Sequence, residues 1–581
     1  MTPRSLFTGA VFVMFATCMI AAQNQVTSPT NKHNLSISGP GPVKSTTMTE
    51  ICVFCHTPHN ANPASPLWNQ ALSTATYTPY SSTTMSVTAG VPTGSSKLCM
   101  SCHDGTVALG STVAKGQIPM QGLTGGKLSG ASSLGLNLGD DHPIGFVPAT
   151  ASDLVNPPAG HAVKLDANGQ VQCATCHDPH RMDADPTTMK FLVASNASSA
   201  LCVVCHKKQY WSTNPSTHMS STKAYTATQG AHTGYATVAT NGCESCHKPH
   251  TAGMPARTLK AQEEFTCGGS GSQCHGSTGI GRNIQSEFNK LYKHPTYSVT
   301  PSVHDPSEGP TNGSRPLPET SAATPRHAEC EDCHNPHASY AAPTTAPKAS
   351  GKLAGVWGIS VTNTLTLPSG TPPSVNEYEI CLKCHGDSAN KPQPTGPTPP
   401  YPNRVVPEFN KRVQFNTANL SYHPVAGVGR NPTVPSLIAP WTVNSIVTCT
   451  DCHDNDTGPN APTPGSGPSG PHGSNFKQLL VANYEADTDR TTESATAYAL
   501  CYKCHDRTRV RTNPGQFDNH GKHILDYQAS CSLCHDPHGV ANTTHLVNFD
   551  KRFVLPKNGV LKWTPGNNGC TLICHGASHP R

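Results

Sequence analysis

Cysteine and histidine are the residues of this chain that could do chemistry, because they are numerous and regularly spaced. The 581 residues include 25 Cys and 31 His. Ten segments read Cys-x-x-Cys-His, and two longer segments also end in Cys-His. The ten are Cys52-Cys55-His56, Cys99-Cys102-His103, Cys173-Cys176-His177, Cys202-Cys205-His206, Cys243-Cys246-His247, Cys330-Cys333-His334, Cys381-Cys384-His385, Cys449-Cys452-His453, Cys501-Cys504-His505 and Cys531-Cys534-His535; the longer two are Cys267-Cys274-His275 and Cys570-Cys574-His575. Apart from Cys18, every cysteine belongs to such a pair.

Two thiols followed directly by an imidazole form the attachment sequence of c-type haem. The thiols make thioethers to the porphyrin, and the histidine binds the iron from one side. Zinc sites do not require His after every cysteine pair, and disulfides would not require it at all. The sequence therefore predicts twelve covalently attached haem c groups. At the two longer motifs a disulfide is the alternative, although the small residues 268–273 could loop out of the first one.

Nineteen further histidines could supply the second ligand of each iron. Five end the pattern Cys-x-x-Cys-His-x-Pro-His, six lie upstream of a motif, and one replaces the x-Pro-His residue that is missing after His453. The first set is His59, His180, His250, His337 and His538; the second is His33, His142, His232, His294, His423 and His523; the replacement is His472. We predict that an upstream His serves the first haem of each pair and an x-Pro-His residue the second. His161 and His520 stay open as alternatives to His142 and His523.

The motifs divide the chain into a signal segment and six two-haem modules. The predicted boundaries are 1–22 for the signal peptide, then 23–135, 136–212, 213–285, 286–405, 406–515 and 516–581. Hydrophobic residues make up 35% and charged residues 13%, with 49 Gly and 53 Pro, so the chain is poor in side chains that build a core. We expect mostly coil with short α-helices and few strands, in an elongated multihaem cytochrome whose stacked haems form the core.

The N-terminus has the pattern of an export signal. Arg4 precedes a largely apolar run from Leu6 to Ile20, and Ala21 and Ala22 follow. We therefore expect export to the periplasm, the outer membrane, the cell surface or the medium. The formal net charge is only +5 and there is no basic run, so a nucleic acid partner is not expected.

The sequence resembles the multihaem c-type cytochromes with a doubled CxxCH motif. The likeness rests on His33-Asn34-Leu35-Ser36, on Cys52 to His59, on Leu98 to Leu109, on Asp141-His142-Pro143 and on the repeated C-x-x-C-H-x-P-H pattern. These proteins are similar to the periplasmic and outer-surface cytochromes of metal-respiring bacteria. The resemblance implies electron transfer from the periplasm or outer membrane to extracellular acceptors such as metal oxides. It also implies other redox proteins as partners, and self-association into filaments.

An electron carrier without a catalytic residue is the leading hypothesis, because two histidines on each iron leave no position for a substrate. One alternative is a multihaem reductase of the nitrite or hydroxylamine type, which would need one haem with an open site. No C-x-x-C-Lys motif, which several such reductases carry, occurs in the chain. A second alternative is the subunit of a polymerising filament, in which a spare histidine such as His545 or His579 would bind a neighbouring protomer.

Overall fold

The structure is a computed structural model, and it describes most of the chain from residue 25 to residue 580. The residues left out are 64, 83–84, 152, 209–210, 212–215, 226–233, 270–273, 298–316, 322–327, 370–373, 390, 392–401, 486–489, 513–518, 565–568 and 575. The predicted signal peptide and the predicted ligands His232 and His575 therefore lie outside the described residues.

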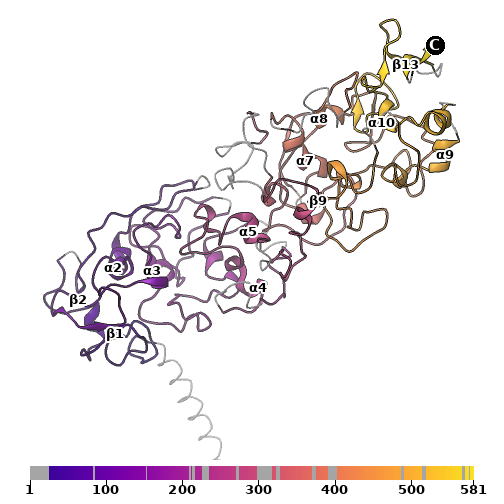
Figure 1. Ribbon diagram of the computed structural model, residues 1–581. Coiled ribbons are helices and arrows are strands. Elements are labelled where there is room, and N and C mark those ends of the chain that lie inside the picture. The colour runs from indigo at the N-terminus through magenta and orange to yellow at the C-terminus, as the bar shows by residue number, and fades with distance from the viewer. Residues whose placement is uncertain are drawn as a thin grey trace, which may run out of the picture. The chain divides into compact units, whose positions relative to one another are not determined.

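The chain forms two compact units (Figure 1). Unit 1 comprises Met1–Thr213 and His218–Thr266, and unit 2 comprises Asn214–Thr217 and Cys267–Arg581. The division falls between Thr266 and Cys267, which is inside the predicted third module.

Unit 1 consists of loops with short helical turns and two pairs of two-residue strands. The helices are α2 (Gly94–His103), α3 (Cys173–Cys176) and α4 (Val238–Asn241), and α5 (Glu263–Cys267) ends just beyond the division; the 3-10 turns are η1 (Cys52–Phe54), η2 (Gly130–Ser132), η3 (Ala197–Ser199), η4 (Cys202–Val204), η6 (Gly242–Ser245) and η7 (Ala256–Thr258). Strand β1 (Lys44–Ser45) pairs with β4 (Met120–Gln121), and β2 (Ser111–Thr112) pairs with β3 (Gly116–Gln117), both antiparallel.

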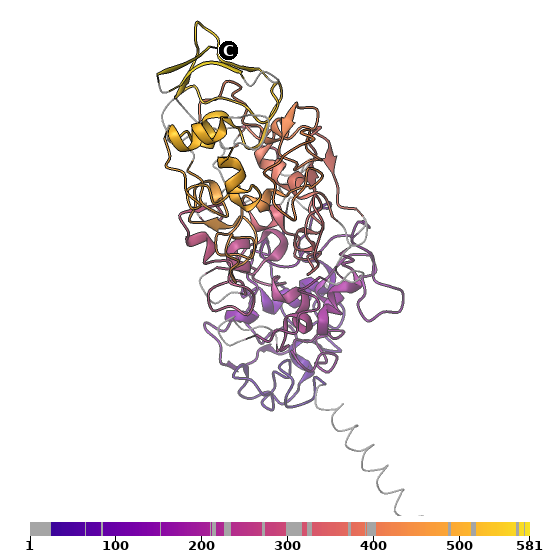
Figure 2. The same cartoon turned by 90° about the vertical axis from the view of Figure 1, so that its right-hand side faces the viewer.

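Unit 2 has the same character, with one larger sheet near its C-terminus (Figure 2). Its helices are α6 (Cys330–Cys333), α7 (Glu377–His385), α8 (Lys411–Gln414), α9 (Arg507–Arg511) and α10 (Cys531–Cys534); its 3-10 turns are η8 (Glu287–Asn289), η10 (Gly351–Leu353), η11 (Cys449–Asp451), η12 (Lys477–Leu479) and η13 (Cys501–Lys503), and η14 (Lys522–Asp526) is π-helical. Three strand pairs are β5 (Tyr292–Lys293) with β9 (Gly473–Ser474), β6 (Gly358–Ile359) with β7 (Leu365–Thr366), and β8 (Ser421–Tyr422) with β10 (Gly539–Val540).

The C-terminal sheet is antiparallel and is centred on its longest strand. Strand β13 (Gly569–Cys574) pairs with β11 (Val554–Leu555), with β12 (Lys562–Thr564) and with β14 (Ala577–Pro580). One face of this sheet packs on the largest buried apolar cluster among the described residues, which includes Leu533, Phe549 and Leu572.

Buried side chains do not build a continuous core in the described parts of either unit. The five apolar clusters hold three to six buried residues each. The predicted fold class, mostly coil with short helices and small strand pairs, is confirmed. None of the helices in the described part of the chain has the length and apolarity of a membrane span.

Candidate haem sites

Each Cys-x-x-Cys-His segment folds as one helical turn. The turn is closed by a hydrogen bond from the backbone N–H of the histidine to the carbonyl of the first cysteine. This bond measures 2.7 to 3.0 Å at His56, His177, His206, His247, His334, His453, His505 and His535. At His103 and His385 the motif is the last turn of α2 and α7. Residues three and four apart on a helical turn are neighbours, so both thiols and the imidazole are presented together.

The longer motif that begins at Cys267 makes the same closure. The N–H of His275 donates to the carbonyl of Cys267 at 2.8 Å, although eight residues rather than four separate the two positions in sequence. Helix α5 ends at Cys267, and six residues lie between the two cysteines in the sequence. The backbone therefore presents the ends of this motif as the ten shorter motifs do.

The longer motif that begins at Cys570 is different, because it runs as strand β13. Cys570 pairs with Trp563, and Cys574 pairs with Ala577. Four residues of strand span about 13 Å, roughly twice the 5–6 Å between neighbouring side chains on a helical turn. The strand does not present its two thiols as the eleven turns do. Neither longer motif forms the disulfide that the sequence left open.

Eight pairs of histidine rings bring a motif imidazole opposite an imidazole from elsewhere in the same unit. The distances between ring centres are 6.2 Å for His33 and His103, 6.1 Å for His56 and His180, 6.2 Å for His142 and His206, 6.1 Å for His177 and His250, 6.3 Å for His294 and His385, 6.0 Å for His334 and His472, 6.3 Å for His453 and His538, and 6.2 Å for His520 and His535.

These distances fit one metal ion between each pair of rings. Two imidazoles on opposite sides of a metal, with bonds of about 2 Å, have ring centres about 6.3 Å apart. The described residues contain no group of three or more His, Cys, Asp or Glu that could hold a metal ion, whereas a structural zinc site needs four ligands. A pair of imidazoles alone suits an iron whose other positions a porphyrin fills.

Backbone carbonyls fix the imidazoles in the form that can bind a metal. Nδ1 lies 2.7 Å from the carbonyl of Ser132 in His103, 3.0 Å from that of Lys190 in His177, 3.0 Å from that of Lys352 in His334, 2.9 Å from that of Gln478 in His453 and 2.9 Å from that of His545 in His535. A carbonyl can only accept, so Nδ1 carries the hydrogen and the lone pair of Nε2 is left for a metal. Burial lowers the pKa of His385 and of His535 to about 3, which keeps both rings neutral.

The second ligands face different motif histidines from those that the sequence predicted. His33, His142 and His294 lie opposite the motif histidine of the second haem of their own modules, not of the first. The Pro-His residues reach backwards along the chain. His180, His250 and His538 lie opposite the first motif histidine of the preceding module, and His472 does the same.

Contacts between distant segments explain this order. Four upstream histidines lie against the Pro-His segment of a later module, so one pair of adjacent segments carries the second ligands of both haems of a module. His33 Nδ1 donates to the carbonyl of Pro179 at 2.8 Å, and the N–H of His142 donates to the carbonyl of Pro249 at 2.7 Å. In unit 2, the N–H of His294 donates to the carbonyl of His472 at 3.3 Å, and that of His423 to the carbonyl of His538 at 3.1 Å.

In the sixth module the second ligand of the first motif is the histidine that the sequence left as an alternative. His520, not His523, lies opposite His535. Both histidines precede the same motif, and nothing in their spacing separates them. The eight pairs do not include His59, His337 or His423. His423 lies beside His505, whose pKa is lowered to about 4 by burial and then by the charge of His423.

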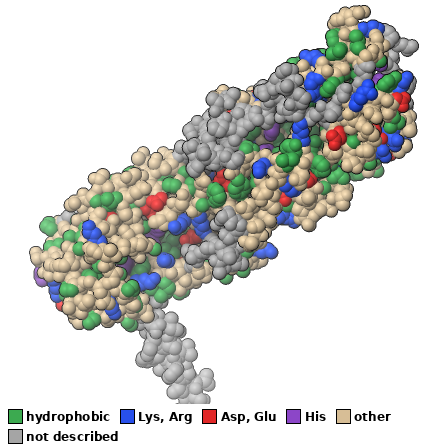
Figure 3. Space-filling model, in the orientation of Figure 1, with side chains coloured by type: hydrophobic (Ala, Val, Ile, Leu, Met, Phe, Trp, Pro, Cys, Tyr) green, Lys and Arg blue, Asp and Glu red, His purple; other side chains and the backbone are tan. Residues whose placement is uncertain are grey.

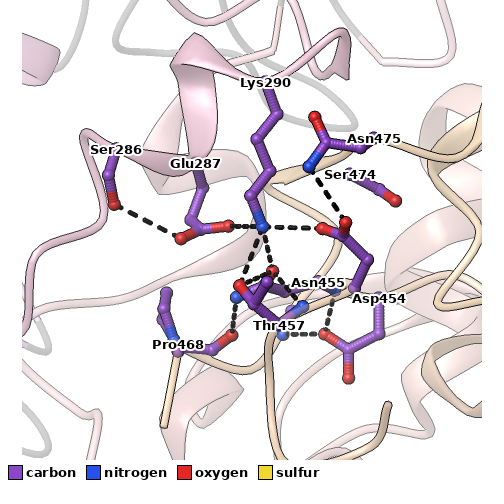
Figure 4. Close-up of polar contacts among 12 residues, drawn as sticks. Ser286, Glu287, Lys290, Asp454, Asn455, Thr457, Pro468, Ser474 and Asn475 are labelled. Carbon is purple, nitrogen blue, oxygen red and sulfur yellow. Dashed lines mark hydrogen bonds and ion pairs between the residues drawn. The ribbon is translucent and has the colours of Figure 1, made fainter. Parts of the chain in front are cut away.

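His472 reaches its position through a loop that a polar cluster holds (Figure 4). Lys290 Nζ contacts Glu287 at 2.6 Å, Asp456 at 2.7 Å and Thr457 at 3.0 Å, and it also donates to Asn455. On the other side of the loop, the fully buried Asp454 accepts from the N–H of Gly470 at 2.5 Å and from Asn460 at 2.6 Å.

The first cysteines of consecutive modules are in contact. Thiol–thiol hydrogen bonds join the second motif of one module to the first motif of the next. The pairs are Cys99 with Cys173, Cys202 with Cys243, Cys381 with Cys449, and Cys501 with Cys531. The hydrogen bond to Cys173 and burial raise the pKa of Cys99 well above its usual range. Groups attached at these thiols would lie side by side.

Comparison with known families agrees with this geometry. Residues 166–210 and 443–510 match the doubled CXXCH motif family. The chain carries the doubled CXXCH motif of multihaem c-type cytochromes. The first matched region contains Cys173 and Cys202, and the second contains Cys449 and Cys501, so each covers the two motifs of one predicted module. A search of curated proteins finds no match. The matched regions are typical of multihaem c-type electron carriers, whose CXXCH motifs bind haem c covalently.

Proposed function

We propose that the protein is a twelve-haem c-type cytochrome that conducts electrons along closely spaced haems with two histidine ligands each. The observation that carries the proposal is the set of eight ring pairs, each with room for one iron. By the same order, His423 would serve the haem of His505. The motif histidines of the eleven turns would be the proximal ligands.

Conduction follows from how the attachment sites are joined. Contacts between Cys99 and Cys173 and between Cys202 and Cys243 link successive modules of unit 1, and contacts at Cys381 and Cys501 do the same in unit 2. Haems anchored at touching cysteines would have their edges in van der Waals reach, so electrons could pass between irons without a change in bonding. Bound haem would supply the redox change. Two histidines would occupy the two positions of each iron that the porphyrin leaves free.

We further propose that the acceptor is extracellular, such as a metal oxide, and that the donors are periplasmic or outer-membrane redox proteins. The export pattern of residues 1–22 supports this location. On the face seen in Figure 3, basic and acidic side chains are interspersed and uncharged surface dominates, which suits transient contacts with several partners. A dedicated reductase would need an open iron, and the eight paired sites offer none.

Intact mass and low-temperature EPR of the ferric protein test the proposal together. Intact mass counts the covalent haems, and EPR separates irons with two strong ligands, which are low-spin, from irons with an open position. We expect twelve haems and only low-spin signals. A stoichiometric high-spin haem in the wild-type protein would contradict the closed chain and favour the reductase.

A filament subunit is the second candidate function, and His59 favours it. His180, His250 and His538 each face an iron site of the preceding module, whereas His59 belongs to the first predicted module. His59 is exposed and belongs to none of the ring pairs above. It is therefore placed to bind an iron of another molecule. Electron microscopy of the wild type should then show assemblies that H59A lacks, with unchanged haem content; equal assembly of both would contradict this role. His545 was also predicted as a ligand for a neighbouring protomer. Its ring centre lies 5.3 Å from that of Trp563 in the same chain.

A further inference from the structure

The C-terminal sheet brings together two histidines that follow no cysteine. His523 on η14 and His579 on β14 have ring centres 5.8 Å apart, with 29° between the ring planes. This is close to the 6.0 to 6.3 Å of the eight other pairs. Nδ1 of His523 donates to the carbonyl of Asn519 at 2.7 Å, so its Nε2 keeps a lone pair for a metal.

The sheet register places His579 on the same face as the last two cysteines. His579 lies directly opposite Leu572 in the pairing of β14 with β13. Residues directly opposite each other in an antiparallel pair point to the same face, and alternate residues of one strand share a face. Cys570, Leu572, Cys574 and His579 therefore share one side of the sheet.

The order of ligands in the other modules points to the same residue. His33, His142 and His294 each lie upstream in a module, and each faces the proximal histidine of that module's second haem. His523 lies upstream in the sixth module in the same way. The ring opposite His523 is that of His579. His579 thus stands where the other modules hold a proximal ligand.

The cysteines nearest the last motif lie together. Cys534, Cys570 and Cys574 pack against the same buried apolar cluster, which includes Leu533 and Leu572. Cys574 directly precedes a histidine in the sequence, as the second cysteine of every other motif does. Cys574 is therefore the thiol that corresponds to the second cysteine of the other motifs.

We propose that the twelfth haem takes His523 and His579 as its two iron ligands and is attached through Cys574 alone. This assignment rests on the proposed function, because it assumes that the motifs carry haem. The S–H of Cys574 adds across one vinyl group of haem: the C–S bond forms, the C=C bond becomes single, and the hydrogen moves to the other vinyl carbon. No oxidant is required. Cys570 keeps its thiol, because four residues of strand span about 13 Å.

Replacing His579 by methionine tests the assignment, because the variant should shift the reduction potential of one haem rather than abolish a signal. H579M would give one haem a His/Met ligand pair, and methionine ligation raises the reduction potential. In a spectroelectrochemical titration we expect one haem of the twelve to move to higher potential in H579M, and none to move in the matched variant H575M. The reverse result, a shifted haem in H575M and none in H579M, would overturn the proposal.

Peptide mapping tests the attachment independently of folding in any variant. Wild-type holoprotein is denatured, alkylated with iodoacetamide and digested. We expect the peptide that contains β13 to carry one haem and one alkyl group, the latter on Cys570. A haem bound by both thiols, or a peptide without haem, would overturn the single attachment.

The two proposals fail in different ways. If the wild-type protein carries far fewer haems than twelve, or several high-spin haems, the proposed function fails. If wild type has twelve low-spin haems but H579M leaves every potential unchanged, only the ligand assignment at His579 fails.

Discussion

The third and fifth modules deliver an equivalent ligand by different routes. In the third module His250 follows the proximal His247 by three residues and lies 6.1 Å from the ring of His177. In the fifth module His472 follows His453 by nineteen residues and lies 6.0 Å from the ring of His334. The final ring positions agree although the connections do not. The ligand position is therefore set by where the chain pairs with the upstream histidine, not by the count of residues after the motif.

The two routes also differ in their polar surroundings. His250 donates from Nδ1 to the buried carboxylate of Asp141 at 3.0 Å. Nδ1 of His472 is buried without a hydrogen-bond partner among the described residues. The residue after the proximal histidine is the exposed Lys248 in one module and the buried Asp454 in the other. In the third module a carboxylate accepts a hydrogen bond from the ligand, whereas in the fifth module a folded loop holds the ligand in place.

Removing either ligand should have the largest effect, and it tests whether the two routes are equivalent. H472A and H250A should each produce one high-spin haem per molecule in ferric EPR, because each iron loses its second imidazole. H161A is the matched control, since His161 accepts from the N–H of Val163 and lies in no ring pair. If H472A kept only low-spin haems while H250A did not, the fifth module would take its ligand from elsewhere.

Loosening the loop should affect the fifth module alone. Lys290 is 13% exposed, and its ion-pair partners Glu287 and Asp456 are 5% and 8% exposed. Removing one member of a buried ion pair costs about 3–5 kcal/mol because the remaining charge is left unpaired. K290M should therefore lower the urea midpoint of the holoprotein and produce a partial high-spin signal. K248M is the control, because the Lys248 ammonium is exposed and donates only to the carbonyl of Thr251. Equal effects of both variants would show that the loop is not held by Lys290.

The carboxylate beside His250 should set a smaller difference between the two haems. A carboxylate that accepts from a ligating imidazole makes the ring a stronger donor to ferric iron. D141N should raise the potential of the His177 haem by about 60 mV for each tenfold loss of preference for the ferric state. Redox titration of one haem against the unchanged remainder measures this. An unchanged potential would mean that Asp141 only positions the ring.

Much of the site could be predicted from the sequence, and the remainder depended on long-range pairing. The spacing of Cys and His predicted the turns at Cys52 or Cys531, because a helical turn is a local structure. The glycine-rich residues 268–273 indicated that the two ends of this longer motif could come together, and His275 does donate to the carbonyl of Cys267. The histidine partners were not local. His33 faces His103 because its ring Nδ1 donates to the carbonyl of Pro179, a contact across 146 residues. The strand at Cys570 was missed because a four-residue cysteine spacing suits a turn or a strand equally.

Asp454 should give the smallest effect, a pH dependence at the position where the third module has Lys248. Burial raises the pKa of Asp454 above its ordinary value of 3.8. The folded chain therefore keeps this proton at pH values where the unfolded chain has lost it, so stability falls as pH rises between the two pKa values. The contribution is complete below pH 3.8 and levels off above the raised pKa. Urea unfolding of D454N should lose this slope, whereas K248N should keep it, because that variant leaves Asp454 in place. A wild-type slope that survives in D454N would assign the pH dependence to another group.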